Sequence, residues 1–420
     1  MQLYEVFTFI ICLAALFSFI NHRFIKWTPT IGVMALSLLF SLGLPVAAHY
    51  SPAFAHACIV LINAIDFHDI LMNGMLGFLL FAGSVHINAE SLKKEIWPIM
   101  ALATLGIFIS TFLVGVMLHY LFLAFSLQVA YIYCFLFAAL ISPTDPIAVL
   151  AILKKAGIPK SLELKIAGES LFNDGVAVVI FLTLLEIAQT GVDAFSVTDV
   201  SLLFLREAVG GLLYGAVLGY LGYWLIHSID KYEVAVMISI ALVMGGYLLA
   251  CKMHISGPLA MVVAGIIIGS PHKKSITNTV AKNYLLRFWE LIDEMLNAIL
   301  FMLIGLEMLV IKFDLNILII GGICILGLLL CRWISVAIPL SLLKYKMSFE
   351  RHAITLLSWG GLRGGLSVAL ALSLPVNMYR NEFVAITYVV VVFSIIVQGL
   401  SIGGLYKKNI GHPILRLILG

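Results

Sequence analysis

Five ionisable residues fall inside long apolar stretches of this sequence: Asp145, Glu169, Asp174, Arg332 and Arg363. An ionised side chain at the centre of a bilayer costs about 3 kcal/mol or more, so such residues are candidates for function by default. Any one of them alone is also explained by a structural ion pair or by a position at a helix end. Considered together they favour an ion pathway, because carboxylate oxygens suit small hard cations and also accept protons.

The sequence GESLFND places two acids on one predicted helix. Ser170 and Asp174 are four residues apart and share a face, whereas Glu169 is rotated from Asp174 by about 140°. The two acids therefore need different partners. We pair Glu169 with Arg332 from a later apolar run, because a buried carboxylate and a buried guanidinium are each costly alone. Asp174 is then the unpaired acid with the Ser170 hydroxyl beside it, and Asp145 is available as a second carboxylate.

Two of the apolar runs are interrupted. Asp145 stands between two prolines in SPTDPIAV, and Arg363 lies among four glycines in SWGGLRGGLS. A break leaves unpaired backbone groups at membrane depth, which is tolerated only inside protein or beside a water-filled cavity. One interrupted helix in each half of a chain indicates an inverted-repeat transporter with its site near the membrane centre. We expect the carboxylate of Asp145 to offset the partial positive charge at N-terminal helix ends. The guanidinium of Arg363 is expected to offset the partial negative charge at C-terminal ends.

The elements that must position these residues are membrane-spanning helices. The chain is 62% hydrophobic and 11% charged, with a mean hydropathy of +1.10, whereas an average soluble domain is about 25% charged. The apolar runs are long and do not alternate, which favours helices over a membrane barrel. We predict an all-α membrane protein with spans at 3–20, 30–48, 69–88, 97–122, 128–154, 161–188, 200–227, 233–251, 255–270, 284–311, 315–343, 350–374 and 382–406.

These thirteen spans imply an orientation and a symmetry. Nineteen of the 25 Lys and Arg residues fall on odd-numbered connections and the C-terminal tail, against four on the opposite side. The positive-inside rule then puts the N-terminus outside and the C-terminus in the cytoplasm. Spans one to six are predicted to repeat, inverted, as spans eight to thirteen, with discontinuous spans five and twelve crossing each other. A short re-entrant or surface helix is expected within 51–66.

Other partners are not indicated. The net charge is +3, and the six cysteines form no CxxC pair, so neither a metal cluster nor a disulfide framework is suggested. About fourteen residues follow the last span. We expect no cofactor, no nucleic-acid partner and no soluble regulatory domain; the lipid bilayer is the expected surrounding.

Four motifs, in this order, resemble those of the monovalent cation:proton antiporter family, in the branch of NhaP-type bacterial and archaeal sodium/proton antiporters and animal sodium/hydrogen exchangers. They are TDP at 144–146, GESLFND at 168–174, LIGLE at 303–307 and GGLRGG at 360–365. The resemblance covers roughly residues 70–400. It implies thirteen helices, a homodimer in a bacterial inner membrane, and a core that carries the ion by an elevator-like movement.

The resemblance also implies a division into domains. A dimerisation domain comprises 1–96 and 191–313, a core ion-binding domain comprises 97–190 and 314–406, and 407–420 is a short cytoplasmic tail.

The same resemblance assigns residue roles. Cation or proton binding is implied at Asp174, Asp145, Ser170, Asn173 and the backbone of Thr144, and the structural ion pair at Glu169 and Arg332. The pair Asn173–Asp174 resembles that of electroneutral one-for-one exchangers, whereas members with two aspartates there are electrogenic.

The predicted function is therefore secondary active sodium (or lithium):proton antiport, with cation and proton competing for Asp174. Ligand chemistry does not fix ion size, so potassium:proton antiport is an open alternative. A cation-coupled symporter for an organic anion needs a roomy second site with extra polar side chains, of which spans five and twelve have few. Glu290, Asp293 and Glu294, at the start of span ten, are interpreted as a solvated face rather than a cation-attracting vestibule.

Overall fold

The computed structural model describes residues 2–191, 197–270, 279–311, 314–345, 349 and 352–407. The secondary structure of these residues is helical throughout, without a named strand, which confirms the all-α prediction. The predicted tail beyond residue 407 lies outside the described part of the chain.

Helices follow one another closely in the first half of the chain. They are α1 (Gln2–Ile20, continued by a π-helical turn Asn21–Ile25), α2 (Pro29–Tyr50), α3 (Pro52–Asn63), α4 (Phe67–Asp69), a π-helical turn (Ile70–Met75), α5 (Leu76–Val85), α6 (Ala89–Lys94), α7 (Ile96–Ala101), a π-helical turn (Leu102–Gly106), α8 (Ile107–Ala124), α9 (Tyr131–Ile141), α10 (Ile147–Lys155) and α11 (Lys160–Thr190).

The second half of the chain is also built of closely spaced helices. Its helices are α12 (Val197–His227), α13 (Tyr232–Lys252), α14 (Gly257–Gly269), α15 (Thr279–Glu307), α16 (Leu315–Leu343), α17 (Ala353–Trp359), α18 (Gly365–Leu372) and α19 (Arg380–Phe393, continued by a π-helical turn Ser394–Gln398).

Helix lies within every range where the sequence predicted a span, and α3 lies where a short helix was expected. Among the described residues, nine helical segments are long and apolar enough to cross a membrane. The other four predicted spans coincide with the short pairs α9–α10 and α17–α18, with the 13-residue α14, and with α15, which carries charged residues in its first half.

Large apolar side chains cover the outside of the molecule as well as its core. On α12, for example, Leu202, Leu213 and Trp224 are each more than half exposed. Water disfavours contiguous apolar surface of this kind, whereas lipid does not. The chain is therefore a multi-pass membrane protein, and the lipid bilayer is its surrounding.

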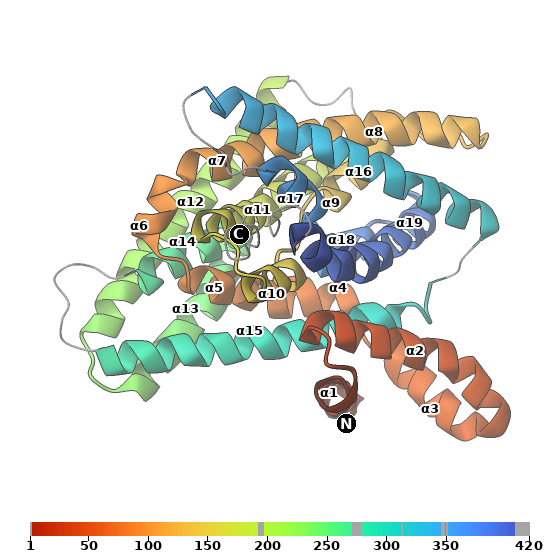
Figure 1. Ribbon diagram of the computed structural model, residues 1–420, viewed down its shortest axis with the longest axis horizontal. Helices are drawn as coiled ribbons and strands as arrows, with labels where there is room; N and C mark the ends of the chain where they lie inside the picture. The colour runs from red at the N-terminus through yellow and green to blue at the C-terminus, as the bar shows by residue number, and fades with distance from the viewer. Residues whose placement is uncertain are drawn as a thin grey trace, which may run out of the picture.

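Two groups of helices are distinguished by their packing. Helices α5, α12, α13 and α14 pack against one another and reach α15, which also packs on α2. Helices α8, α9 and α11, together with α16, α17, α18 and α19, form the other set of contacts. In Figure 1 the short helices α9, α10, α17 and α18 lie in the middle of the molecule, with α16 above them and α15 below.

The first group is held by close backbone contact. Gly211, Gly215 and Gly219 of α12 recur every fourth residue and face α14. A β-carbon added at Gly215 would stand 2.5 Å from the carbonyl oxygen of Ala260. Small residues at this spacing allow two membrane helices to approach closely, and dispersion contacts then hold them. This packing leaves no room for a larger residue at Gly215.

Candidate cation-binding site

The two helix interruptions meet each other. Between α9 and α10, and again between α17 and α18, the chain is extended for a few residues. The backbone N–H of Asp145 in the first break donates to the carbonyl oxygen of Leu362 in the second, at 2.8 Å. Each break therefore supplies a partner for backbone groups that the other has left without a helical one.

An arginine stands at the C-terminal end of each leading half-helix. After α9, Arg363 Nη1 donates to the carbonyl oxygens of Ser142 and of Pro143, the latter at 3.0 Å. Near the end of α17, Arg332 Nη2 donates to the carbonyl oxygen of Leu357 at 3.2 Å. The last carbonyls of a helix carry partial negative charge and lack internal donors. Arg363 was predicted to offset negative helix ends, and its guanidinium lies at the end of α9. The contact of Arg332 with α17 was not anticipated.

Asp145 lies against the N-terminal ends of the two following half-helices. Its Oδ1 accepts from the backbone N–H of Ile147 in α10 at 2.9 Å. A β-carbon added at Gly364, the residue before α18, would stand 2.6 Å from Asp145 Oδ2. The carboxylate is thus placed where helix ends carry partial positive charge. Gly364 is required here because any side chain would displace the carboxylate.

Glu169 and Arg332 form a buried ion pair. Arg332 Nη1 lies 2.6 Å from Glu169 Oε1, and the two residues are 6% and 2% exposed. Removing one partner of such a pair leaves an uncompensated charge away from water. Because Arg332 of α16 also contacts Leu357, the pair joins α11, α16 and α17. The negative charge of Glu169 is therefore neutralised by Arg332.

Thr144, Ser170 and Asn173 bind one another. Thr144 Oγ1 lies 3.2 Å from Ser170 Oγ and accepts from Asn173 Nδ2 at 2.9 Å, and the Thr144 N–H donates to Asn173 Oδ1 at 3.4 Å. All three are buried. Thr144 lines the cavity described next, but Ser170 and Asn173 do not. The Asn173 side chain, which was predicted to take part in cation or proton binding, fastens the first break to α11 through these hydrogen bonds.

Asp174 and Asp145 open into a cavity of about 1240 Å³. Both are half-buried, and their negative charges lie close enough to repel each other. Within the described part of the chain, the Asp174 carboxylate has neither a hydrogen-bond nor an ion-pair partner. Asp174 therefore faces a polar cavity rather than lipid and is not neutralised by an arginine. A site of this kind gains stability from any bound cation or proton.

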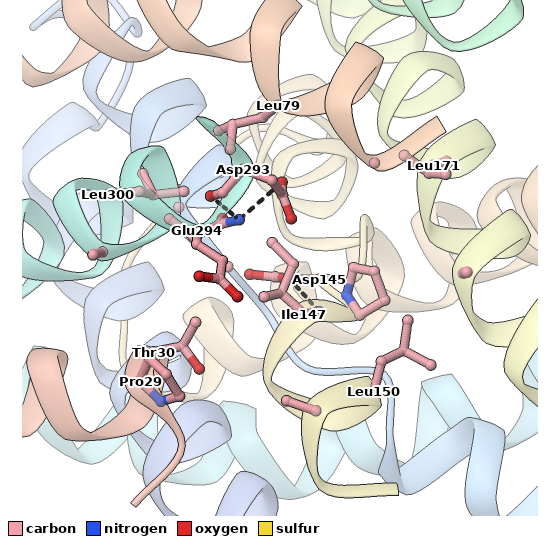
Figure 2. A pocket seen from close by; sticks show the side chains of 18 of the residues that line it. Pro29, Thr30, Leu79, Asp145, Ile147, Leu150, Leu171, Asp293, Glu294 and Leu300 are labelled. Carbon is pink, nitrogen blue, oxygen red and sulfur yellow. Dashed lines mark hydrogen bonds between the residues drawn. The ribbon is translucent and has the colours of Figure 1, made fainter. Parts of the chain in front are cut away.

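The opposite wall of the cavity is α15. Figure 2 shows Asp293 and Glu294 of this helix across from Asp145. Glu290 and Asn297 also line the cavity. The sequence interpretation of these acids as merely a solvated face is therefore incomplete. Their spacing, with a polar side chain on every turn between 290 and 297, was a signal that they share one face.

The arrangement limits the kind of ion that it suits. No group of three or more His, Cys, Asp or Glu side chains among the described residues could hold a metal ion together. Two carboxylates with neutral oxygens nearby are hard ligands, which suit hard cations rather than soft transition metals.

Fold and site together define a class: a multi-pass membrane transporter with half-buried carboxylates beside two interrupted helices. The sequence profile described as sodium/hydrogen exchanger, transmembrane, matches residues 6–408. The chain belongs to the sodium/hydrogen exchanger family, which confirms the resemblance drawn from the motifs.

Individual relatives agree. The chain is 47% identical over 414 residues to the Na(+)/H(+) antiporter NhaP of Pseudomonas aeruginosa, covering 96% of each protein. It is 37% identical over 350 residues to the Na(+)/H(+) antiporter NhaH of Halobacillus dabanensis, covering 81% of this chain and 83% of that one. The fold is similar to that of the sodium proton antiporter MjNhaP1 from Methanocaldococcus jannaschii at pH 8, with a TM-score of 0.76 and 20% identity over 98% of this chain and all of that one.

Proposed function

We propose that this protein is a secondary active sodium (or lithium):proton antiporter of a bacterial inner membrane, in which cation and proton compete for Asp174. The observation that carries the proposal is the Asp174 carboxylate, which opens into the cavity and has no partner among the described residues. The relatives in P. aeruginosa and H. dabanensis, both named as Na(+)/H(+) antiporters, support it.

The proposed ligands are the carboxylates of Asp174 and Asp145 with oxygens of Thr144 and Ser170. Since the Thr144 and Ser170 hydroxyls already contact each other, the cation displaces or shares that hydrogen bond. Asn173 holds Thr144 in place. When neither ion is bound, the two neighbouring negative charges make the site costly to bury. Each ion must therefore replace the other before the site moves.

One-for-one stoichiometry follows from the charge on the site. Glu169 is neutralised by Arg332 throughout, and Asn173 cannot ionise. Asp174 then carries one sodium ion in one direction and one proton in the other, so the loaded site has the same charge both ways. We propose that the exchange is electroneutral.

We propose thirteen crossings arranged as inverted repeats, with crossed interrupted helices. The N-terminus lies outside and the C-terminus in the cytoplasm. Lys26, Lys154 and Lys155, which the positive-inside rule assigns to the cytoplasmic side, line the cavity that contains Asp174. The conformation is accordingly open to the cytoplasm.

The two packing groups support the proposed domains: 1–96 with 191–313 as the dimerisation part of a homodimer, and 97–190 with 314–406 as the moving core.

The cavity disfavours organic-anion symport. Although its volume of about 1240 Å³ would admit a small organic molecule, six carboxylates line it against three lysines, so an anion would be repelled. Potassium:proton antiport differs only in the ion, and the experiment below separates it from the sodium reaction.

The test is proton movement in everted vesicles with a pH-sensitive dye, adding sodium, lithium, potassium and choline in turn. We expect wild type to respond to sodium and lithium, and Asp174→Asn to lose the response while keeping its expression and elution volume. Asp314→Asn, an exposed acid at the start of α16, is the matched control and should transport normally. A response to potassium alone would favour the other cation, and normal transport by Asp174→Asn would overturn the proposal.

A further inference from the structure

A second pair of oxygen-bearing side chains lies on α15, one turn apart. Asn297 Nδ2 donates to the backbone carbonyl oxygen of Asp293 at 2.8 Å and to its Oδ1 at 3.0 Å. Both donated bonds use the amide nitrogen. The arrangement fixes the Asp293 carboxylate and leaves its second oxygen available.

The Asn297 amide oxygen is the unexplained atom. Asn297 is only 3% exposed, and its Oδ1 is buried without a hydrogen-bond partner among the described residues. An amide oxygen can accept two hydrogen bonds, and leaving a buried acceptor unsatisfied is unfavourable. A bound cation would satisfy this oxygen and the neighbouring carboxylate together.

The pair stands across the cavity from the interrupted helices. Asp293 and Asn297 line the same cavity as Asp145 and Asp174. The charge of Asp145 repels both that of Asp293 and that of Asp174, whereas no such interaction joins Asp293 and Asp174 directly. The three acids nevertheless do not gather into one group able to hold a metal ion. Asp145 is therefore the acid that interacts with both of the others.

We propose that Asp293 and Asn297 form a second, weaker site for sodium or lithium, from which the cation passes by way of Asp145 to Asp174. The proposal rests on the proposed antiport. Since α15 belongs to the proposed dimerisation part and the interrupted helices to the core, the second site faces Asp145 in the conformation open to the cytoplasm. The second site therefore supplies cations to Asp174 from the cytoplasmic side.

Transport kinetics give the first test, in everted vesicles whose outer surface is the cytoplasmic face. Asp293→Asn should raise the half-saturating sodium concentration about fivefold, the size of one partly screened charge contact, with little change in maximal rate. Asn297→Ala removes a neutral ligand and should raise half-saturation by a smaller factor. The matched control is Glu290→Gln, an exposed acid about one turn earlier on the same helix and in the same cavity. It should leave half-saturation unchanged.

If Glu290→Gln raises the half-saturating sodium concentration as much as Asp293→Asn does, sodium is attracted by the general negative charge of the cavity. The proposal of a second site is then overturned. The site is also overturned if both α15 variants elute normally and transport with wild-type half-saturation.

Direct binding separates this proposal from the antiport itself. Purified Asp174→Asn, which lacks the main site, should still broaden the sodium-23 NMR signal, and the double variant Asp174→Asn/Asp293→Asn should not. Loss of all broadening in Asp174→Asn alone would show a single site, leaving the antiport intact. If Asp174→Asn still transports sodium, the antiport proposal fails instead, whatever the binding result.

Discussion

The α12–α14 contact and the interrupted-helix region hold their helices together by opposite means. Helix α12 is continuous over 31 residues and meets α14 through glycines, so backbone touches backbone. Helices α9, α10, α17 and α18 are 7 to 11 residues long, and charged side chains satisfy their ends. The first region uses shape alone and suits a fixed scaffold. The second uses charge, and it can therefore leave one carboxylate open to an exchangeable ion.

The largest expected effect comes from removing the buried ion pair of the interrupted-helix region. Glu169→Ala leaves Arg332 buried without its carboxylate, so we expect a loss of about 3–5 kcal/mol in stability. Glu163→Ala is the control: it is also a glutamate of α11, but its ion pair with Lys154 is partly exposed at 2.9 Å and should be worth about 0–1 kcal/mol. Thermal unfolding in detergent measures both. Equal shifts in Tm would show that the buried pair has no special structural role.

A smaller effect is expected from the scaffold. Gly215→Ala places a methyl group against the Ala260 carbonyl, and overpacking of this kind costs about 1–3 kcal/mol. Gly245→Ala on neighbouring α13 is matched in chemistry, but its added carbon meets nothing within 4 Å. We expect Gly215→Ala to lower Tm and Gly245→Ala to leave it unchanged or raised. Sodium half-saturation should be the same in both, because neither touches the cavity. A change in half-saturation with Gly215→Ala would mean that the two regions are not separable.

Sequence patterns located the interrupted helices well because their cause is local. Proline on both sides of Thr144–Asp145 and glycine on both sides of Arg363 weaken a helix locally. Single prolines, by contrast, are accommodated within α2 (Pro45) and α16 (Pro339). The partners of Glu169 and Arg332 were also accessible to reasoning, because two costly charges in apolar runs require each other.

The remaining features depend on which distant helices approach, and local spacing does not contain that information. Thr144 and Asn173 are 29 residues apart in sequence but hydrogen-bond each other. The Asn173 side chain is engaged in this contact and does not line the cavity. Asp293 reaches the cavity only because α15 packs across from a break more than a hundred residues earlier in the chain. A polar face on a helix does not reveal from the sequence whether it borders bulk water or a binding cavity.

The most direct test of competition at Asp174 is the half-saturating sodium concentration of wild type measured at a series of pH values on the cytoplasmic face. If the two ions exclude each other from one carboxylate, half-saturation rises in proportion to proton concentration as pH falls, while the maximal rate at saturating sodium stays constant. A half-saturation independent of pH, with the maximal rate falling instead, would show that the proton acts at a different group and would contradict a shared site.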